Sequence, residues 1–264
     1  MTSVELQLQI AAMTPHVIAV ALCAARLLPV VFLCPVLGGE AAPTTVKLGV
    51  VLALSMCVHF AGGVAPLEAV SDALTLASLV VREFSFGVAL GLVASLPFDA
   101  ARMGGKLVDL FRGSSAEAAL PHAGTRESAA GDGLYQLMVA MVATGAVMPL
   151  MLKGLFHSYA VVKLGAFAHT ESAAMHVVTL AGVALGTGLA IGAPVAAAAL
   201  AVDCVMGLAS RAAPQMNLQD VGAPLKILAG GAVLFLTIGV IAQAMLAEAA
   251  GAGGAMQALM ELGR

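Results

Sequence analysis

Long apolar runs separated by short polar stretches occupy most of the sequence, and they predict an all-helical membrane protein. Each run approaches the roughly 20 residues that a helix needs to cross the hydrocarbon core of a bilayer. No soluble stretch interrupts the series, so we expect one domain over residues 1–264, built from helical hairpins. The six expected helices are approximately Val17–Val36, Leu48–Leu67, Ala73–Pro97, Leu134–Leu152, Ala173–Val202 and Ile227–Ala247.

Prolines and glycines within these runs predict kinks and irregular helix ends. Pro29, Pro35 and Pro43 surround the end of the first run, and Pro194 lies inside the fifth. Non-helical backbone at membrane depth is tolerated only where other protein or a water-filled cavity satisfies its polar groups. The kinked helices are therefore expected to pack against protein neighbours.

Charged residues inside the apolar runs are the second unusual feature. Arg26 lies in the first run and Glu83 in the third. A charge at this depth costs a few kcal/mol unless it has a partner or water. Glu83, Gly87 and Gly91 recur at every fourth residue, so the acid and a groove of small residues share one helix face.

The segment between Asp203 and Lys226 joins the last two apolar runs. Asp203, Gly207 and Arg211 lie on one helix face, and a polar turn is expected over about residues 212–223. Pro224 suits the first turn of the next helix, where the cation of Lys226 would oppose the helix dipole. Lys226 is therefore expected to serve a group outside its own helix.

Two roles are open for Glu83 and Asp203. The first is structural pairing inside an assembly, with Arg26 and Arg211 as the natural partners. The sequence leaves open which acid pairs with which arginine. The second is a path for protons or ions, as in a secondary transporter of ions or small solutes. We favour structural pairing.

One long segment, from about residue 111 to 133, has no apolar periodicity. It is rich in glycine, serine and alanine, and it follows a charged stretch that contains Asp109 and is expected to extend the third helix. Loops of this length inside a compact protein are usually functional or disordered. The segment is our first candidate for a moving part.

Composition narrows the possible functions further. Hydrophobic residues make up 61% of the chain and charged residues 10%, whereas soluble proteins carry about 25% charged residues. The formal net charge of −3 and the lack of a basic run exclude a nucleic-acid backbone as partner. No catalytic or cofactor-binding motif is present, and the four cysteines and six histidines are scattered without metal-ligand spacing. We therefore expect a protein that is not an enzyme and has no metal or cofactor.

Three groups of residues together resemble the FliR/SctT family, whose members belong to the export apparatus of bacterial flagella and of type III secretion injectisomes. The most specific group reads R-x-A-P-Q-x-N followed by P-x-K, from Arg211 to Lys226, and the likeness covers nearly the whole chain. The groups consist of Arg26, Pro29, Pro35, Gly38, Pro43 and Lys47; of Glu83, Gly87, Gly91, Gly105, Asp109 and Gly113; and of Pro194, Asp203, Gly207, Arg211, Pro214, Gln215, Asn217, Pro224 and Lys226.

The resemblance implies a multi-pass subunit of a protein export gate in the bacterial inner membrane. Such a subunit joins FliP/SctR-like and FliQ/SctS-like proteins in a helical, pore-like hetero-oligomer, with FlhB/SctU-like and FlhA/SctV-like proteins as further partners. The gate conducts unfolded protein substrates, and the motifs suit a flagellum and an injectisome equally. The resemblance also implies a plug that closes the pore, here at Phe111, Arg112, Gly113, Ser114, Ser115, Glu117 and Pro121.

Overall fold

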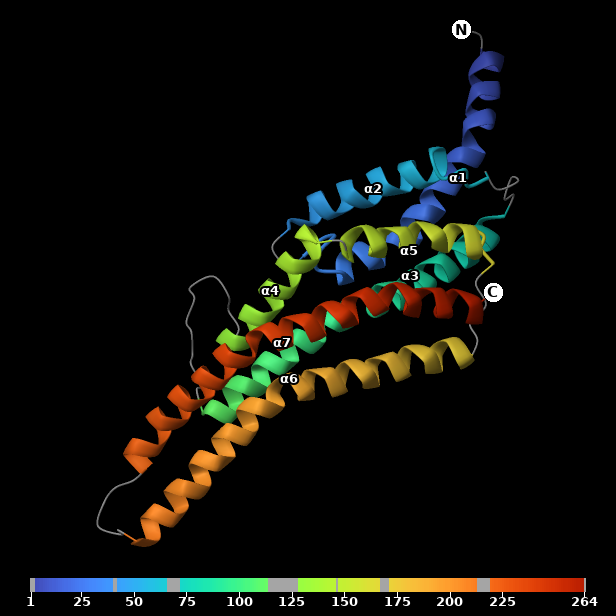
Figure 1. Ribbon diagram of the computed structural model, residues 1–264. Coiled ribbons are helices and arrows are strands. Elements are labelled where there is room, and N and C mark those ends of the chain that lie inside the picture. The colour runs from blue at the N-terminus through green and yellow to red at the C-terminus, as the bar shows by residue number, and fades with distance from the viewer. Residues whose placement is uncertain are drawn as a thin grey trace. The chain divides into compact units, whose positions relative to one another are not determined.

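The computed structural model shows an all-helical chain (Figure 1). It describes residues 3–39, 42–65, 72–113, 128–145, 147–166, 171–212 and 219–263. The helices within these ranges are α1 (Ser3–Leu33), α2 (Thr44–Phe60), α3 (Ala73–Arg112), α4 (Ala129–Thr144), α5 (Val147–Val161), α6 (Glu171–Ala212) and α7 (Gln219–Leu262).

Four of the described helices contain segments long and apolar enough to cross a membrane, namely Ala12–Leu33, Ala73–Arg112, Glu171–Ala212 and Gly222–Leu262. The helices α4 and α5, which follow one another closely in the sequence, can count together as a fifth span. The remaining helix, α2, is apolar but has only 17 residues. The fold is thus the multi-pass helical architecture that the hydropathy pattern predicts.

The bounds of the expected helices differ from the structure, most clearly for the second, the fourth and the last. The last expected helix, Ile227–Ala247, is shorter than α7, which begins at Gln219 and ends at Leu262. The second expected helix was placed at Leu48–Leu67, but α2 begins at Thr44 and ends at Phe60. Just beyond it Gly63 has a φ of 66°, a left-handed conformation that reverses the chain and that glycine adopts without strain. The fourth, Leu134–Leu152, is not continuous, because α4 ends at Thr144 and α5 begins at Val147.

The expected effect of Pro224 was also wrong, whereas Pro149 lies in the first turn of α5, where its missing N–H is not needed. Pro224 was expected to begin the last helix, but α7 begins at Gln219 and contains Pro224. In contrast, Pro43 directly precedes α2, as the first region of the sequence suggested.

The chain divides into two compact units. The first unit contains residues 1–95, 146–180 and 250–264, and the second contains residues 96–145 and 181–249. The helices α3, α6 and α7 are each divided between the two units, so that one part of each helix belongs to the first unit and the other part to the second. Each unit has its own set of buried polar contacts.

In the first unit α1 and α3 approach each other closely at glycines. A Cβ atom added to Gly87 would lie 2.2 Å from the carbonyl oxygen of Arg26, and one added to Gly91 would lie 3.1 Å from that of Pro29. Only glycine permits this separation of the two backbones. Helix α1 also packs against α2, where His16 Nδ1 and His59 Nε2 are 3.0 Å apart.

In the second unit α3 packs against α6 in the same way. A Cβ atom added to Gly104 would lie 2.6 Å from the side chain of Ile191, and one added to Gly188 would lie 3.0 Å from the carbonyl oxygen of Ala100. Gly188 and Gly192, four residues apart in α6, thus both face α3. A Cβ atom added to Gly182 or Gly186 would have no described atom of another helix within 4 Å.

Candidate functional site

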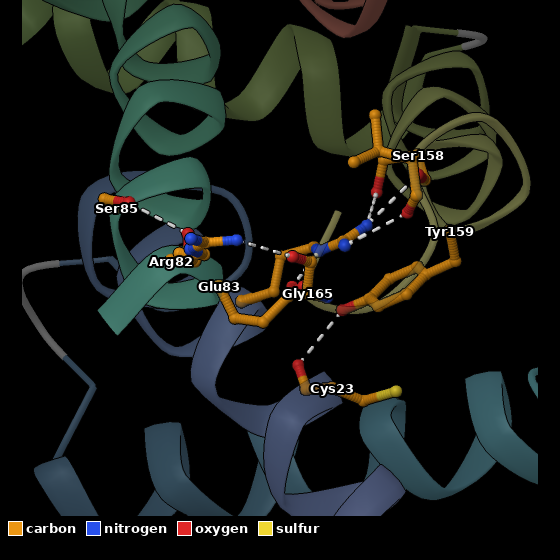
Figure 2. Close-up of polar contacts among 9 residues, drawn as sticks. Cys23, Arg82, Glu83, Ser85, Ser158, Tyr159 and Gly165 are labelled. Carbon is orange, nitrogen blue, oxygen red and sulfur yellow. Dashed lines mark hydrogen bonds and ion pairs between the residues drawn. The ribbon is translucent and has the colours of Figure 1, made fainter. Parts of the chain in front are cut away.

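The first polar cluster is formed by Arg26 of α1 and Glu83 of α3, both fully buried. Arg26 Nε donates to Glu83 Oε2 at 2.6 Å. Figure 2 shows the contacts around this pair, which lies in the first unit. The intramembrane acid of the third apolar run is therefore paired with the arginine of the first.

The same two side chains also hold the end of α5. Arg26 donates from Nη1 to the carbonyl oxygen of Ser158 at 3.0 Å and from Nη2 to that of Val162 at 3.1 Å. The N–H of Gly165 donates to Glu83 Oε1 at 2.6 Å. Because the last carbonyls of a helix lack intrahelical donors, the guanidinium group acts as a cap for α5. The Arg26–Glu83 pair therefore joins three helices.

Aromatic rings complete the surroundings of Arg26. Its guanidinium carbon lies 4.8 Å from the ring centroid of Phe86 and 4.3 Å from that of Tyr159. The Tyr159 hydroxyl donates to the carbonyl oxygen of Cys23 at 3.0 Å (Figure 2). Each donor nitrogen of Arg26 has a partner, and the ring faces add cation–π attraction.

The second cluster lies in the second unit and joins both sides of the 114–127 segment. Asp109, near the end of α3, accepts from Ser128 Oγ at 2.5 Å and from the N–H of Ala130 at 2.8 Å. Ser128 in turn caps α4 by accepting from the N–H of Gly131 at 3.0 Å. We call this set of contacts the Asp109 clasp. It fixes where the chain leaves α3 and where it enters α4.

Arg112 connects the clasp to α7. Its Nη1 lies 3.7 Å from Asp109 Oδ1, and its Nη2 donates to the carbonyl oxygen of Ile227 at 3.4 Å. Gly230 leaves room for this side chain, because a Cβ atom added there would lie 2.5 Å from Arg112 Cγ. Arg112, one of the expected plug residues, is therefore attached to α7 through its side chain.

A third pair joins α6 and α7. Lys226 Nζ lies 2.5 Å from Asp203 Oδ1, and both side chains are partly exposed. Lys226 thus contacts a group outside its own helix, and the partner of Asp203 is a lysine where we expected an arginine. Arg211 lies in the exposed last turn of α6.

Several expected site residues lie elsewhere or outside the described part of the chain. Phe111 and Gly113 are at the end of α3, Pro194 is inside α6, and Gly207 is on its exposed surface. The structure places Pro29 inside α1 and Pro35 in the turn that follows. The residues outside the described ranges are Ser114, Ser115, Glu117, Pro121, Pro214, Gln215 and Asn217.

Sequence reasoning missed the α5 side of the first cluster and the α4 side of the second. Ser158 and Gly165 act through backbone groups, which carry no sequence signal. Ser128 could have been recognised, because a serine before an apolar helix is a preferred N-cap residue.

Taken together, the chain is an integral membrane protein of long apolar helices whose intramembrane charges are paired. Among the described residues no three histidine, cysteine or acidic side chains could hold a metal ion. The comparison with known families agrees: the sequence profile of "Bacterial export proteins, family 1" matches residues 17–251. The chain belongs to this family, whose members are non-enzymatic membrane components of the flagellar or type III export apparatus.

Named relatives come from both kinds of export system. The chain is 27% identical to the flagellar biosynthetic protein FliR of Bacillus subtilis, over 62% of this chain and 64% of that protein. It is 29% identical to the Yop proteins translocation protein T of Yersinia pestis, over 67% and 69%. For FliR of Aquifex aeolicus the identity is 26%, over 82% and 83%. The alignment with the Bacillus relative thus spans less than two thirds of that protein.

Proposed function

We propose that this protein is a structural subunit of the inner-membrane export gate that conducts unfolded proteins, and that its 111–133 segment closes the gate at rest. The observation that carries this proposal is the Asp109 clasp. It holds the two ends of the segment together while residues 114–127 lie between them, so the segment has a fixed base. A plug needs such a base in order to return to the same place after each opening.

The apolar faces of the second unit support the assembly part of the proposal. In the most apolar 18-residue stretch of α7 only 11% is buried within this chain, and the side chains of Phe235 and Leu236 are each 78% exposed. Apolar surface of this extent is covered either by lipid or by protein. In this proposal sister subunits that resemble FliP/SctR and FliQ/SctS cover part of it.

Gating follows from the contacts at the base of the segment. At rest, residues Phe111 to Pro121 block the conduit, and FlhB/SctU-like and FlhA/SctV-like partners deliver the substrate. Arg112 connects the base to α7, so a displacement of α7 by a neighbouring subunit would pull on the clasp. Opening requires no bond chemistry, only the movement of the segment.

The transporter alternative has little support in the geometry. Glu83 is fully buried, and its two carboxylate oxygens accept from Arg26 and from Gly165. Both carboxylate oxygens are thus engaged, and neither is exposed to a passing ion. Asp203 is paired with Lys226 and belongs to the other unit, so the two acids do not form a common site within either unit.

A deletion tests the gate directly. Replacing residues 114–127 by a short glycine-serine linker leaves the clasp residues in place. We expect export to continue while the resting membrane becomes permeable to small dyes or ions. A matched control, Asp109→Asn with the segment intact, should leak less than the deletion. A deletion strain that stays sealed and secretes normally would contradict the plug.

A further inference from the structure

A large groove lies in the first unit, and Tyr159, whose ring packs against Arg26, forms part of its wall. It encloses about 770 Å³ between the C-terminal end of α2, the turn that follows it and the C-terminal end of α5. Its lining is mainly apolar and includes Val58, Ala61, Phe156, Ala160 and Leu164. Ligand pockets typically enclose about 300–1,000 Å³, so the groove is large enough for a chain-like apolar ligand.

Two cationic side chains lie at the turn that follows α5, and this turn forms one end of the groove. Lys163, directly beyond α5, lines the groove and is exposed to solvent. Arg82 of α3 reaches the same turn, where its Nη1 lies 3.5 Å from the carbonyl oxygen of Gly165 (Figure 2). The neighbouring acid, Glu83, is already occupied by Arg26 and by the N–H of Gly165. This end of the groove therefore offers positive charge that the nearby carboxylate does not neutralise.

The lining offers few groups that could bind a peptide. A bound peptide needs partners for its N–H and C=O groups. Apart from Lys163 and the Cys57 thiol, the one polar side chain of the lining is that of Tyr159, whose hydroxyl already donates to the carbonyl oxygen of Cys23. An aliphatic chain has no such groups and gains free energy simply by leaving water.

We propose that this groove binds an anionic phospholipid, with an acyl chain between α2 and α5 and the phosphate near Lys163 and Arg82. An apolar wall with a cationic end matches an amphiphile that has a negative head group. Basic pockets between the helices of membrane proteins bind anionic lipids by the same combination of charge and apolar contact. The lipid would cover the end of α5, which the Arg26–Glu83 pair holds from the inside.

A cysteine in the wall of the groove provides the readout. Cys57 lines the groove and is exposed, whereas Cys23 and Cys34 are buried. The experiment measures the rate of maleimide labelling at Cys57 by mass spectrometry. It uses the delipidated full-length protein in its native complex, with added dioleoyl phosphatidylglycerol or phosphatidylcholine. Cys204, which is exposed in the second unit, reports any general effect of the detergent or the lipid.

We expect phosphatidylglycerol at ten times its Kd to slow Cys57 labelling about tenfold, since the unoccupied fraction falls by that factor. Phosphatidylcholine and glycerol 3-phosphate should protect much less. Lys163→Gln should weaken the protection, Lys163→Arg should keep it, and the control Lys153→Gln, an exposed position of α5 outside the lining, should not change it.

Three results would overturn the lipid site. Equal protection by both lipids would show a groove without charge selectivity. Equal protection by glycerol 3-phosphate would show a site for soluble anions. A Cys57 that does not react even in the delipidated complex would show that a protein partner covers the groove. None of these results bears on the gate, because the 111–133 segment belongs to the second unit.

Discussion

Neutralising Glu83 tests the structural role of the buried pair most sharply. Glu83→Gln keeps the shape of the side chain but leaves the fully buried Arg26 guanidinium without its anion. Removing one partner of a buried ion pair costs about 3–5 kcal/mol, because an uncompensated charge stays in the interior. We expect the free energy of unfolding to fall by about this amount.

Replacing the other partner of the pair, Arg26, should lower the free energy of unfolding at least as much. Arg26→Met leaves the Glu83 carboxylate unpaired and also removes the donor to the Val162 carbonyl. The double variant, Arg26→Met with Glu83→Leu, contains no buried charge. Since replacing a whole buried pair by apolar groups is often close to neutral, the double variant should lose less stability than the two single variants together.

The assay is unfolding by sodium dodecyl sulfate in mixed micelles, followed by circular dichroism of the purified protein. Arg82→Gln is a suitable control, because Arg82 precedes Glu83 in the chain but is exposed, and its loss should change stability little. If Glu83→Gln changed stability by no more than about 0.5 kcal/mol, as surface substitutions do, the structural role of the pair would be refuted. If the double variant lost as much stability as the two single variants together, the direct interaction between Arg26 and Glu83 would be refuted.

Three further predictions concern the second unit and the helix contacts. Asp109→Asn should weaken the clasp and raise hydrogen exchange at the start of α4, measured by mass spectrometry; unchanged exchange would show that the clasp does not hold this turn. Gly87→Ala should lower stability by about 1–3 kcal/mol in the same detergent assay, because its Cβ meets the Arg26 carbonyl, whereas Gly182→Ala meets open space and should be tolerated. Exchanging Asp203 and Lys226 should preserve secretion better than reversing either charge alone, as secretion assays would show.

The sequence predicted the class of fold well because hydropathy reports directly on membrane helices. It also predicted that the charge of Glu83 is paired, because an isolated charge at this depth is costly. That Gly87 and Gly91 form a contact face followed from helical periodicity. The partner of each charge could not be read, because partners far apart in the sequence meet only through tertiary packing. Arg26 and Glu83 are 57 residues apart.

Helix ends were predicted less well, for a related reason. Helix α5 continues through the polar residues Lys153, His157 and Ser158, which break the apolar run without breaking the helix. Likewise α7 begins at Gln219, within a stretch whose polarity suggests a turn. Hydropathy measures transfer to lipid, whereas helix ends depend on capping and on backbone hydrogen bonds.

The most direct test of the export-gate assignment is co-purification from the native membrane. The tagged chain is expressed with its genomic neighbours, isolated in mild detergent and weighed intact by native mass spectrometry. The account predicts a complex in which this chain is joined by several copies of two small hydrophobic proteins, which cover part of the exposed apolar faces of α6 and α7. Recovery of the chain without bound partner proteins, although its genomic neighbours are expressed with it, would contradict it.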